Sequence, residues 1–265
     1  MKTHPLWKYL RKDALPHFFC PGCGAAQVMN FFLQAADECG LDFDQLVAIG
    51  GVGCAARIPV YLNVEALHGV HGRTLAWATG IKLYKPELTV VVFAGDGDAC
   101  AIGGNHLIHA CRRNLNVVMI VVNNLTFGMT GGQAAPTTPK TMKSATTPYG
   151  NIEAPFDVCR LAQAAGATYV ARWTTARPKR AKNALKDALN HKGFSLVEII
   201  TQCPTHFGRI ALSTGNPVDG LDWIQSHSIT QKRARKLPPH QLESTFVLGN
   251  FVNEKRPVFI GSSVV

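Results

Sequence analysis

The sequence predicts an α/β fold, with a mostly parallel sheet and helices on both of its faces. Apolar segments of strand length alternate with segments of helical periodicity along most of the chain. Several strand-like segments end in glycine-rich or polar loops, as parallel strands do at the ligand-binding edge of open sheets. The 265 residues, 46% of them hydrophobic, suffice for one large core. We expect residues 1–204 to form this domain. Periodicity weakens after Thr205, so we expect residues 205–265 to form an extended tail that packs on a partner subunit.

The composition argues against several classes of protein. No apolar run approaches the ~18–20 residues that a membrane span needs. The N-terminal run MKTHPLWKYLRKDALPHFF lacks the continuous apolar stretch of a secretory signal. We therefore expect a cytoplasmic protein with no membrane span. The formal net charge of +10 would suit nucleic acid, but no helix-turn-helix, zinc-finger or RNA-binding signature accompanies it. We expect no nucleic-acid partner and interpret the charge as a solvated or docking face.

The first expected element is a helix that follows the run CPGCG, with Cys20 and Cys23 just before it. Apolar side chains recur at helical spacing from Ala25 to Cys39, and Gly40 fits the C-terminal stop. A two-residue gap between cysteines lets two thiolates hold one metal ion or cluster, and it also serves thiol–disulfide exchange. The pair alone does not choose among zinc, iron–sulfur and redox roles. Eight cysteines in a reducing compartment indicate metal, redox chemistry or core packing rather than a disulfide framework.

A short strand over Leu46–Ile49 leads into a glycine-rich loop and then a run of basic side chains. Three glycines in four residues, ending at Gly53, indicate a hard turn or a close backbone approach before Cys54. Two histidines follow in another glycine-rich loop with no carboxylate nearby, which disfavours a metal site there. We expect a role facing cofactor or substrate, with the arginines as candidate clamps for a carboxylate. The residues concerned are Arg57, His68, His71 and Arg73.

The central unit of the chain is a βαβ pattern. Buried strands are expected at Thr89–Ala94 and Val117–Val122, with Ile102–Asn114 as the crossover helix. Asp96 and Asn124 follow the two strands and lie 28 positions apart, which leaves room for one helix and a return strand. Parallel strands joined this way place both loops on the same sheet edge. A carboxylate, a carboxamide and several glycines suit an Mg²⁺ that shares its ligand positions with phosphate oxygens.

The remaining elements complete the alternation. A long loop rich in Gly, Thr and Pro follows Asn124, and its first part is expected to lie over a bound cofactor. Its second part is expected to be a surface or interface segment. The later expected elements are a helix at Phe156–Ala165, a strand at Ala167–Ala171, a basic helix at Pro178–His191 and a strand at Phe194–Ile200 that leads to Cys203.

The paired loops resemble the thiamine-diphosphate motif, which is GDG, about thirty residues, and then NN. In that family the Asp, the second Asn and a backbone carbonyl two residues later hold Mg²⁺ on the diphosphate. The resemblance therefore implies Asp96, Asn124 and Thr126 as magnesium ligands. It implies a thiamine-diphosphate-binding fold of the diphosphate type, with Gly53, Gly95 and Gly97 beside the cofactor.

Cysteines gather at the same expected edge. Cys54 and Cys203 each follow a strand of the parallel sheet, and Cys20 and Cys23 could join them. Four thiolates suit a [4Fe–4S] cluster or a structural zinc. A position next to a thiamine cofactor favours the cluster, because zinc offers no redox chemistry.

At this level of detail the chain resembles the β subunit of 2-oxoacid:ferredoxin oxidoreductases, and most closely the 2-oxoglutarate branch. The resemblance extends from about Asp13 to the segment FVNEKRP. It is carried by the runs FCPGCG, GVGC, HGR, ATG, GDGDACAIGGNHLIHACRRN, NNLTFGMTGGQ and TQCPTHFGR. It implies that the four cysteines above hold a [4Fe–4S] cluster. It also implies that Met129 and Thr130 contact the thiamine and that Arg57 tunes the choice of substrate.

The resemblance implies an oxidative decarboxylation of a 2-oxo acid with coenzyme A, with electrons passed through the cluster to ferredoxin. The first expectation is 2-oxoglutarate to succinyl-CoA, with His71, Arg57 and Arg73 as candidate catalytic residues. Nothing in the chain resembles the pyrimidine-binding half of such a site. The resemblance therefore implies an α subunit, with γ and δ subunits as further candidate partners. The alternatives are pyruvate or branched-chain 2-oxo acids, or a non-redox thiamine decarboxylase or synthase subunit with a structural zinc.

Overall fold

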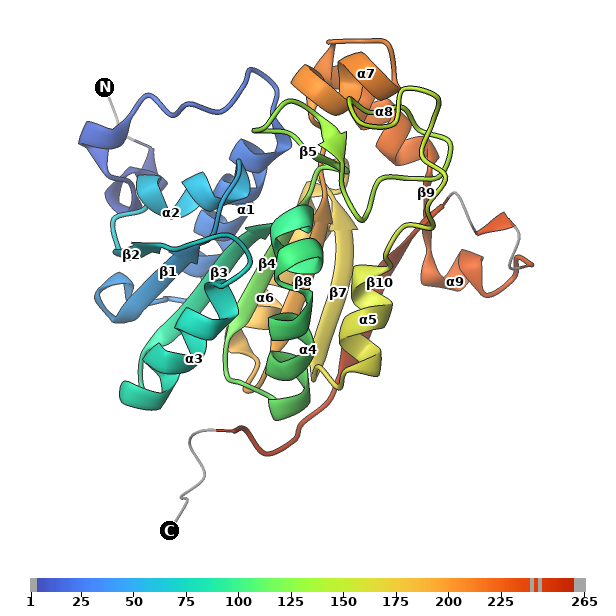
Figure 1. The fold of residues 1–265 in the computed structure, drawn as a ribbon. Coiled ribbons are helices and arrows are strands. Elements are labelled where there is room, and N and C mark those ends of the chain that lie inside the picture. The colour runs from blue at the N-terminus through green and yellow to red at the C-terminus, as the bar shows by residue number, and fades with distance from the viewer. Residues whose placement is uncertain (1–3, 239–240, 243–244, 260–265) are drawn as a thin grey trace.

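A computed structural model describes residues 4–238, 241–242 and 245–259. Within these residues an eight-stranded sheet runs through the centre of the molecule in the order β2-β1-β3-β4-β8-β7-β10-β9 (Figure 1). Neighbouring strands are parallel except for the pair formed by β7 and β10. The strands are β1 Leu46–Gly50, β2 Glu65–His68, β3 Thr89–Gly95, β4 Val118–Asn123, β7 Tyr169–Thr174, β8 Ser195–Ile200, β9 Ser228–Thr230 and β10 Phe246–Asn253. The predicted mostly parallel α/β fold is confirmed.

Helices cover both faces of the sheet. One face carries α1 (Gly24–Glu38), α2 (Ile58–Tyr61) and α6 (Pro178–Asn190), and the other carries α3 (Thr74–Tyr84), α4 (Gly104–Arg113) and α5 (Val158–Ala164). In Figure 1, α3, α4 and α5 lie in front of the strands and α1 and α6 lie behind them. Both faces of the central strands are therefore buried, which explains why those strands read as continuous apolar runs.

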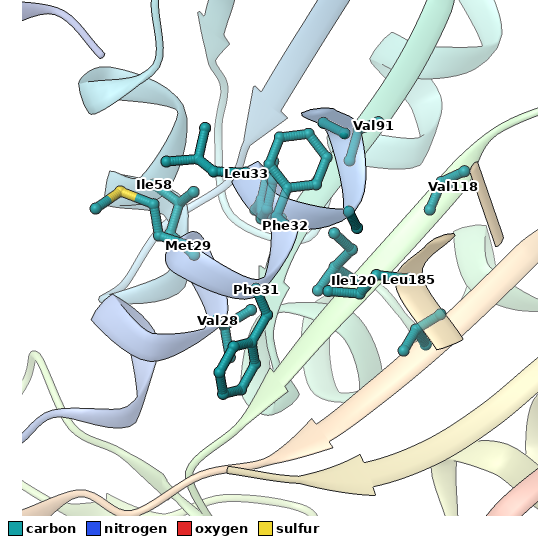
Figure 2. Close-up of a cluster of buried hydrophobic side chains, with 14 of the residues drawn as sticks. Val28, Met29, Phe31, Phe32, Leu33, Ile58, Val91, Val118, Ile120 and Leu185 are labelled. Atoms are coloured by element: carbon teal, nitrogen blue, oxygen red, sulfur yellow. The ribbon is translucent and has the colours of Figure 1, made fainter. Parts of the chain in front are cut away.

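Each face has its own hydrophobic core. Figure 2 shows the core under α1, where Phe32 lies among side chains of α1 and the strands. The ring of Phe32 packs edge-on against Phe93 of β3, with ring centroids 5.1 Å apart. On the opposite face, Cys100, Cys111 and Cys159 are buried in the second core. These three cysteines pack as small apolar residues.

The predicted strands match β1, β3, β4 and β8 to within one residue, and the strand predicted at Ala167–Ala171 is β7, which begins two residues and ends three residues later. The crossover helix starts later than expected. We expected the helix over Ile102–Asn114, and α4 begins at Gly104. The preceding residues, Gly97–Ile102, form a π-helical turn. Such turns are typical of functional sites, and this one keeps the backbone beside Asp96 away from regular helical geometry. Asn114 ends α4 in the left-handed conformation, with a φ of 51°.

The segment after residue 204, expected to be an extended tail, contains regular structure. It contains α7 (Arg209–Ala211), α8 (Pro217–Ser226), α9 (Gln231–Ala234), β9 and β10. β10 pairs with β7 and so continues the central sheet. Residues 1–3 of the expected domain and residues 239–240, 243–244 and 260–265 of the expected tail lie outside the described residues. Contact of this segment with a partner subunit stays a prediction.

The long loop after β4 is also ordered by its own contacts. A short antiparallel pair, β5 (Thr126–Phe127) and β6 (Gln133–Ala134), folds its first part into a hairpin over the sheet edge. Thr138 donates its hydroxyl to the carbonyl of Leu125 at 2.7 Å, and Asn151 donates its amide to the carbonyl of Thr138 at 2.8 Å. Among the described residues, no helix has the length and apolar character needed to cross a bilayer.

Candidate functional site

The carboxyl ends of four adjacent strands, β1, β3, β4 and β8, meet at one edge of the sheet. Because these strands are parallel neighbours, the loops that follow them converge there. A pocket lies at this edge, and its lining includes Gly53, His71, Asp96, Asn124, Met129 and Thr130. The structure thus brings together most of the residues that the sequence singled out for a cofactor.

In this pocket the side-chain oxygen of Asn124 faces two other oxygen atoms. The carboxamide oxygen of Asn124 lies 3.2 Å from Asp96 Oδ1 and 2.6 Å from the carbonyl oxygen of Thr126. All three atoms are acceptors, so no hydrogen bond relieves their repulsion. Either the amide of Asn124 turns over, or a cation binds between the oxygens. A hard cation such as Mg²⁺ prefers these ligand types, and the donor set therefore fits the metal.

The carboxylate of Asp96 supports the same interpretation. Its side chain is only 1% exposed. Burial raises its pKa to about 7, although the hydrogen bond from Thr137 acts in the opposite direction. A buried carboxylate without a counter-charge is costly, and a bound divalent cation would supply that charge.

Glycines bring the backbone close to the pocket. Gly53 lines the pocket with a φ of 113°, a conformation that side chains rarely tolerate. Gly97 packs under the ring of Phe127, and a Cβ on it would meet that ring at 2.1 Å. No atom lies within 4 Å of the Cβ position of Gly53, so a phosphate group could approach the main chain there, whereas at Gly97 that space is filled by Phe127.

The four predicted cluster cysteines are neighbours beside this pocket. A Cβ built on Gly128 would lie 3.4 Å from the Asn124 amide nitrogen, 3.7 Å from Cys203 Sγ and 3.9 Å from Cys54 Sγ. Burial, together with the neighbouring thiols of Cys54, Cys203 and Cys20, raises the pKa of Cys23 to about 12. Burial likewise raises the pKa of Cys54 to about 11. Thiolates at these positions therefore need positively charged partners such as metal ions.

These cysteines do not form a compact cage for one ion. Within the described residues, no three Cys, His, Asp or Glu side chains form a group that could hold a single metal ion. A four-iron cluster binds its thiolates through separate iron atoms and so does not require such a compact group. The arrangement is compatible with a cluster, and ligation by these four residues stays a prediction.

Of the three candidate catalytic residues, only His71 lines the pocket. Its ring lies edge-on to Phe127, with ring centroids 6.3 Å apart. Arg73 is exposed and donates from Nη1 to the carbonyl of Ile102 at 3.3 Å. Arg57 is also exposed, and its charge lies near the thiol of Cys54. Both arginines lie outside the set of residues that line the pocket.

Asp98 is a site residue that sequence reasoning missed. It is 3% exposed, and its Oδ1 accepts a hydrogen bond from the Gly72 amide at 2.7 Å. The same oxygen lies 2.7 Å from His71 Nδ1. A Cβ on Gly51 would meet Asp98 Oδ2 at 2.2 Å, so the carboxylate packs directly on that backbone. Asp98 thus joins three loops of the site. The second Asp of GDGD was the available signal.

Comparison with known proteins agrees with this geometry. Residues 51–199 match a family model described as the thiamine pyrophosphate enzyme C-terminal TPP-binding domain. The chain is 47% identical to the 2-oxoglutarate synthase subunit KorB of Methanocaldococcus jannaschii over 97% of this chain and 95% of that protein. It is 55% identical to the subunit of the same name from Archaeoglobus fulgidus, over 75% of this chain and 74% of that one.

A solved structure is similar over nearly the whole chain. It is 2-oxoglutarate:ferredoxin oxidoreductase from Magnetococcus marinus with 2-oxoglutarate, coenzyme A and succinyl-CoA bound. The two chains superpose with a TM-score of 0.84 at 31% sequence identity, covering 98% of this chain and 88% of the other.

Proposed function

Because the chain belongs to the β subunits of 2-oxoglutarate and related 2-oxoacid:ferredoxin oxidoreductases, we propose that it holds both thiamine diphosphate and a [4Fe–4S] cluster. The chain is one subunit of a heteromeric oxidoreductase and contains a thiamine-diphosphate-binding domain. Beyond this family membership, we also assign the metal, the cluster, the substrate and the electron acceptor.

One observation carries this proposal. The oxygen set of Asp96, Asn124 and Thr126 lies near the cysteines, because a Cβ on Gly128 would be within 4 Å of Asn124 Nδ2, Cys203 Sγ and Cys54 Sγ. A thiamine enzyme without redox chemistry has no need of thiolates there. A purely structural metal protein has no need of the oxygen set.

Each part of the pocket then has a role. Asp96, Asn124 and the Thr126 carbonyl hold Mg²⁺, and the glycine-rich backbone lies along the diphosphate. Met129 and Thr130, which line the pocket, contact the thiamine. The chemistry that thiamine diphosphate would supply when held there is a sink for the electron pair that stays on the 2-oxo carbon when carbon dioxide leaves. Cys20, Cys23, Cys54 and Cys203 hold the cluster, which takes electrons one at a time.

The remaining site residues act on the substrate. His71 is placed to hold or move a proton at its ring nitrogen Nε2, because Nδ1 faces Asp98. Arg57 and Arg73 are candidates for binding a substrate carboxylate. Both are exposed at the pocket's periphery, so we propose that they act at the interface with the α subunit.

The proposed substrates are 2-oxoglutarate and coenzyme A, with succinyl-CoA as the product, and ferredoxin as the electron acceptor. The names of the similar proteins favour 2-oxoglutarate over pyruvate or branched-chain acids. The formal net charge of +10 suits docking of an acidic ferredoxin. Turnover with ferredoxin should then fall as salt concentration rises, and a flat response would remove the docking argument.

The test uses the assembled complex purified without oxygen. Iron, acid-labile sulfide and thiamine diphosphate are measured per β subunit, and acyl-CoA formation is assayed with a panel of 2-oxo acids. We expect iron and sulfide in amounts that match one cluster, and the fastest acyl-CoA formation from 2-oxoglutarate. Zinc in place of iron would overturn the cluster assignment, and preference for pyruvate would overturn only the substrate assignment.

A further inference from the structure

Thr137 lies behind the proposed magnesium site and has no role in the reaction described above. Its side chain is 4% exposed, and it belongs to the segment between β6 and α5. Its hydroxyl donates to Asp96 Oδ2, whereas Asp96 Oδ1 faces the amide of Asn124. Thr137 therefore binds the carboxylate oxygen that does not face Asn124.

The single proton of the Thr137 hydroxyl has two possible acceptors. The second is Asn123 Oδ1, at 3.1 Å. That oxygen already accepts the backbone N–H of Leu125 at 3.0 Å. An ionised carboxylate is the stronger acceptor, so the proton of Thr137 points to Asp96.

The amide of Asn123 is itself held in one orientation. Its Nδ2 donates to Glu198 Oε1 at 2.7 Å, and a carboxylate can only accept. Glu198 is held in turn by Arg172, whose Nε donates to Oε2 at 2.6 Å. Asn123 must therefore present its nitrogen to Glu198 and its oxygen to Thr137.

We propose that Thr137 is a positioning residue for Asp96. Its hydroxyl fixes the rotation of the carboxylate, so that Oδ1 alone is offered to the cation, and Asn123 with Glu198 keeps the hydroxyl proton directed at Asp96. Hydrogen bonds of this kind to a metal-binding carboxylate set metal affinity. This inference rests on the proposed magnesium role of Asp96.

The test compares Thr137→Val, which keeps the shape and removes the hydroxyl, with Thr137→Ser, which keeps the hydroxyl. The complex is stripped of metal with a chelator, and Mg²⁺ is titrated while thiamine diphosphate binding is followed. We expect the apparent Mg²⁺ affinity to fall by about 10–100-fold in T137V. T137S should stay close to wild type.

A matched control is available in Thr174, a buried threonine of β7 whose hydroxyl has no hydrogen-bond partner in the described part of the chain. Thr174→Val should leave the Mg²⁺ affinity unchanged. Should T137V fail to assemble, Thr137→Ala takes its place with the same expected loss.

The outcomes separate this inference from the function it rests on. If T137V binds Mg²⁺ as wild type does, or if T137S is as weak as T137V, Thr137 does not position Asp96 through its hydroxyl. If thiamine diphosphate binds the wild-type complex equally well without any divalent ion, the magnesium role of Asp96 fails first.

Discussion

Arg172 of β7 and Glu198 of β8 are register partners inside the sheet, and Arg172 Nε lies 2.6 Å from Glu198 Oε2. Arg172 is 6% exposed and Glu198 is 1% exposed. Arg172 also donates to Asp157 Oδ1 at the start of α5. Removing one partner of such a pair leaves the other charge buried without compensation, which costs far more than the pair itself contributes.

We therefore expect Arg172→Met to lower the stability of the fold by about 3–5 kcal/mol. The measurement is the midpoint of thermal unfolding of the purified complex. Lys8→Ala is the matched control, because Lys8 pairs with Asp37 on the surface, at 3.2 Å, and surface pairs add little. Equal midpoints for the two variants would show that the buried pair is not needed.

His68 is the last residue of β2 and His71 lies in the loop that follows, and of these two only His71 lines the pocket. We expect His71→Gln to lower the kcat of the complex roughly 100-fold or more, as loss of a positioned proton-transfer group does. Thiamine diphosphate binding should be retained. His68→Gln, at an exposed position, should leave kcat unchanged. A kcat for H71Q near the wild-type value would remove His71 from the site.

Gly51 offers an independent check on Asp98. An alanine Cβ at position 51 would approach Asp98 Oδ2 to 2.2 Å, so Gly51→Ala should push the carboxylate away from His71. We expect a fall in kcat in the same direction as for H71Q. Gly80→Ala is the control, since its Cβ would meet no atom within 4 Å. Full activity in G51A would mean that the Asp98–His71 contact is dispensable.

The iron bound by cysteine variants of the complex distinguishes cluster ligands from packing cysteines. Cys54→Ser should lose cluster iron while the complex keeps thiamine diphosphate, because Cys54 lies among the four neighbouring thiols. Cys39→Ser should keep its iron. Cys39 lies between α1 and α6, where Asn190 Nδ2 is 3.3 Å from its sulfur. Iron retained in C54S, or lost in C39S, contradicts the ligand assignment.

His191 predicts a pH effect on stability. Burial lowers its pKa below the ordinary value of 6.5. The folded state then binds fewer protons than the unfolded state, so stability is full above pH 6.5 and is lost as the pH falls through 6.5 toward the folded pKa. His191→Gln should weaken this loss. Part of the loss of stability at low pH should remain in this variant, because burial and Arg73 also lower the pKa of His106. Unfolding midpoints between about pH 7.5 and about pH 5.5 test this, and identical pH curves would refute it.

The sequence was most informative where apolar runs ended. The strands β1, β3, β4 and β8 are buried on both faces. Their apolar segments, and the polar loops that follow them, could therefore be recognised from the sequence. β2 was missed because Glu65–His68 lies at the sheet edge and is mostly exposed. β10 was missed because its pairing with β7 bridges a long separation in sequence.

The contacts that the supporting residues make could not be predicted from the sequence, although the second Asp of GDGD marked Asp98 as a candidate. Asp98 meets Gly72 across 26 positions, and Thr137 meets Asp96 across 41. Such contacts depend on how loops fold over the sheet, and a threonine in a Thr- and Pro-rich loop gives no local signal. Arg57 and Arg73 were interpreted as residues that bind a substrate carboxylate from residue type alone. Both are exposed, so this role has to be tested in the complex with the α subunit.

The two outermost strands of the sheet bear on how this subunit can be assembled. β2 has four residues and β9 has three. Edges this short offer another chain little template for β-pairing, a common protection against aggregation. A neighbouring subunit therefore gains little by continuing the sheet. The heteromer should be joined through helices and loops, which leaves the cofactor edge free to form part of the contact.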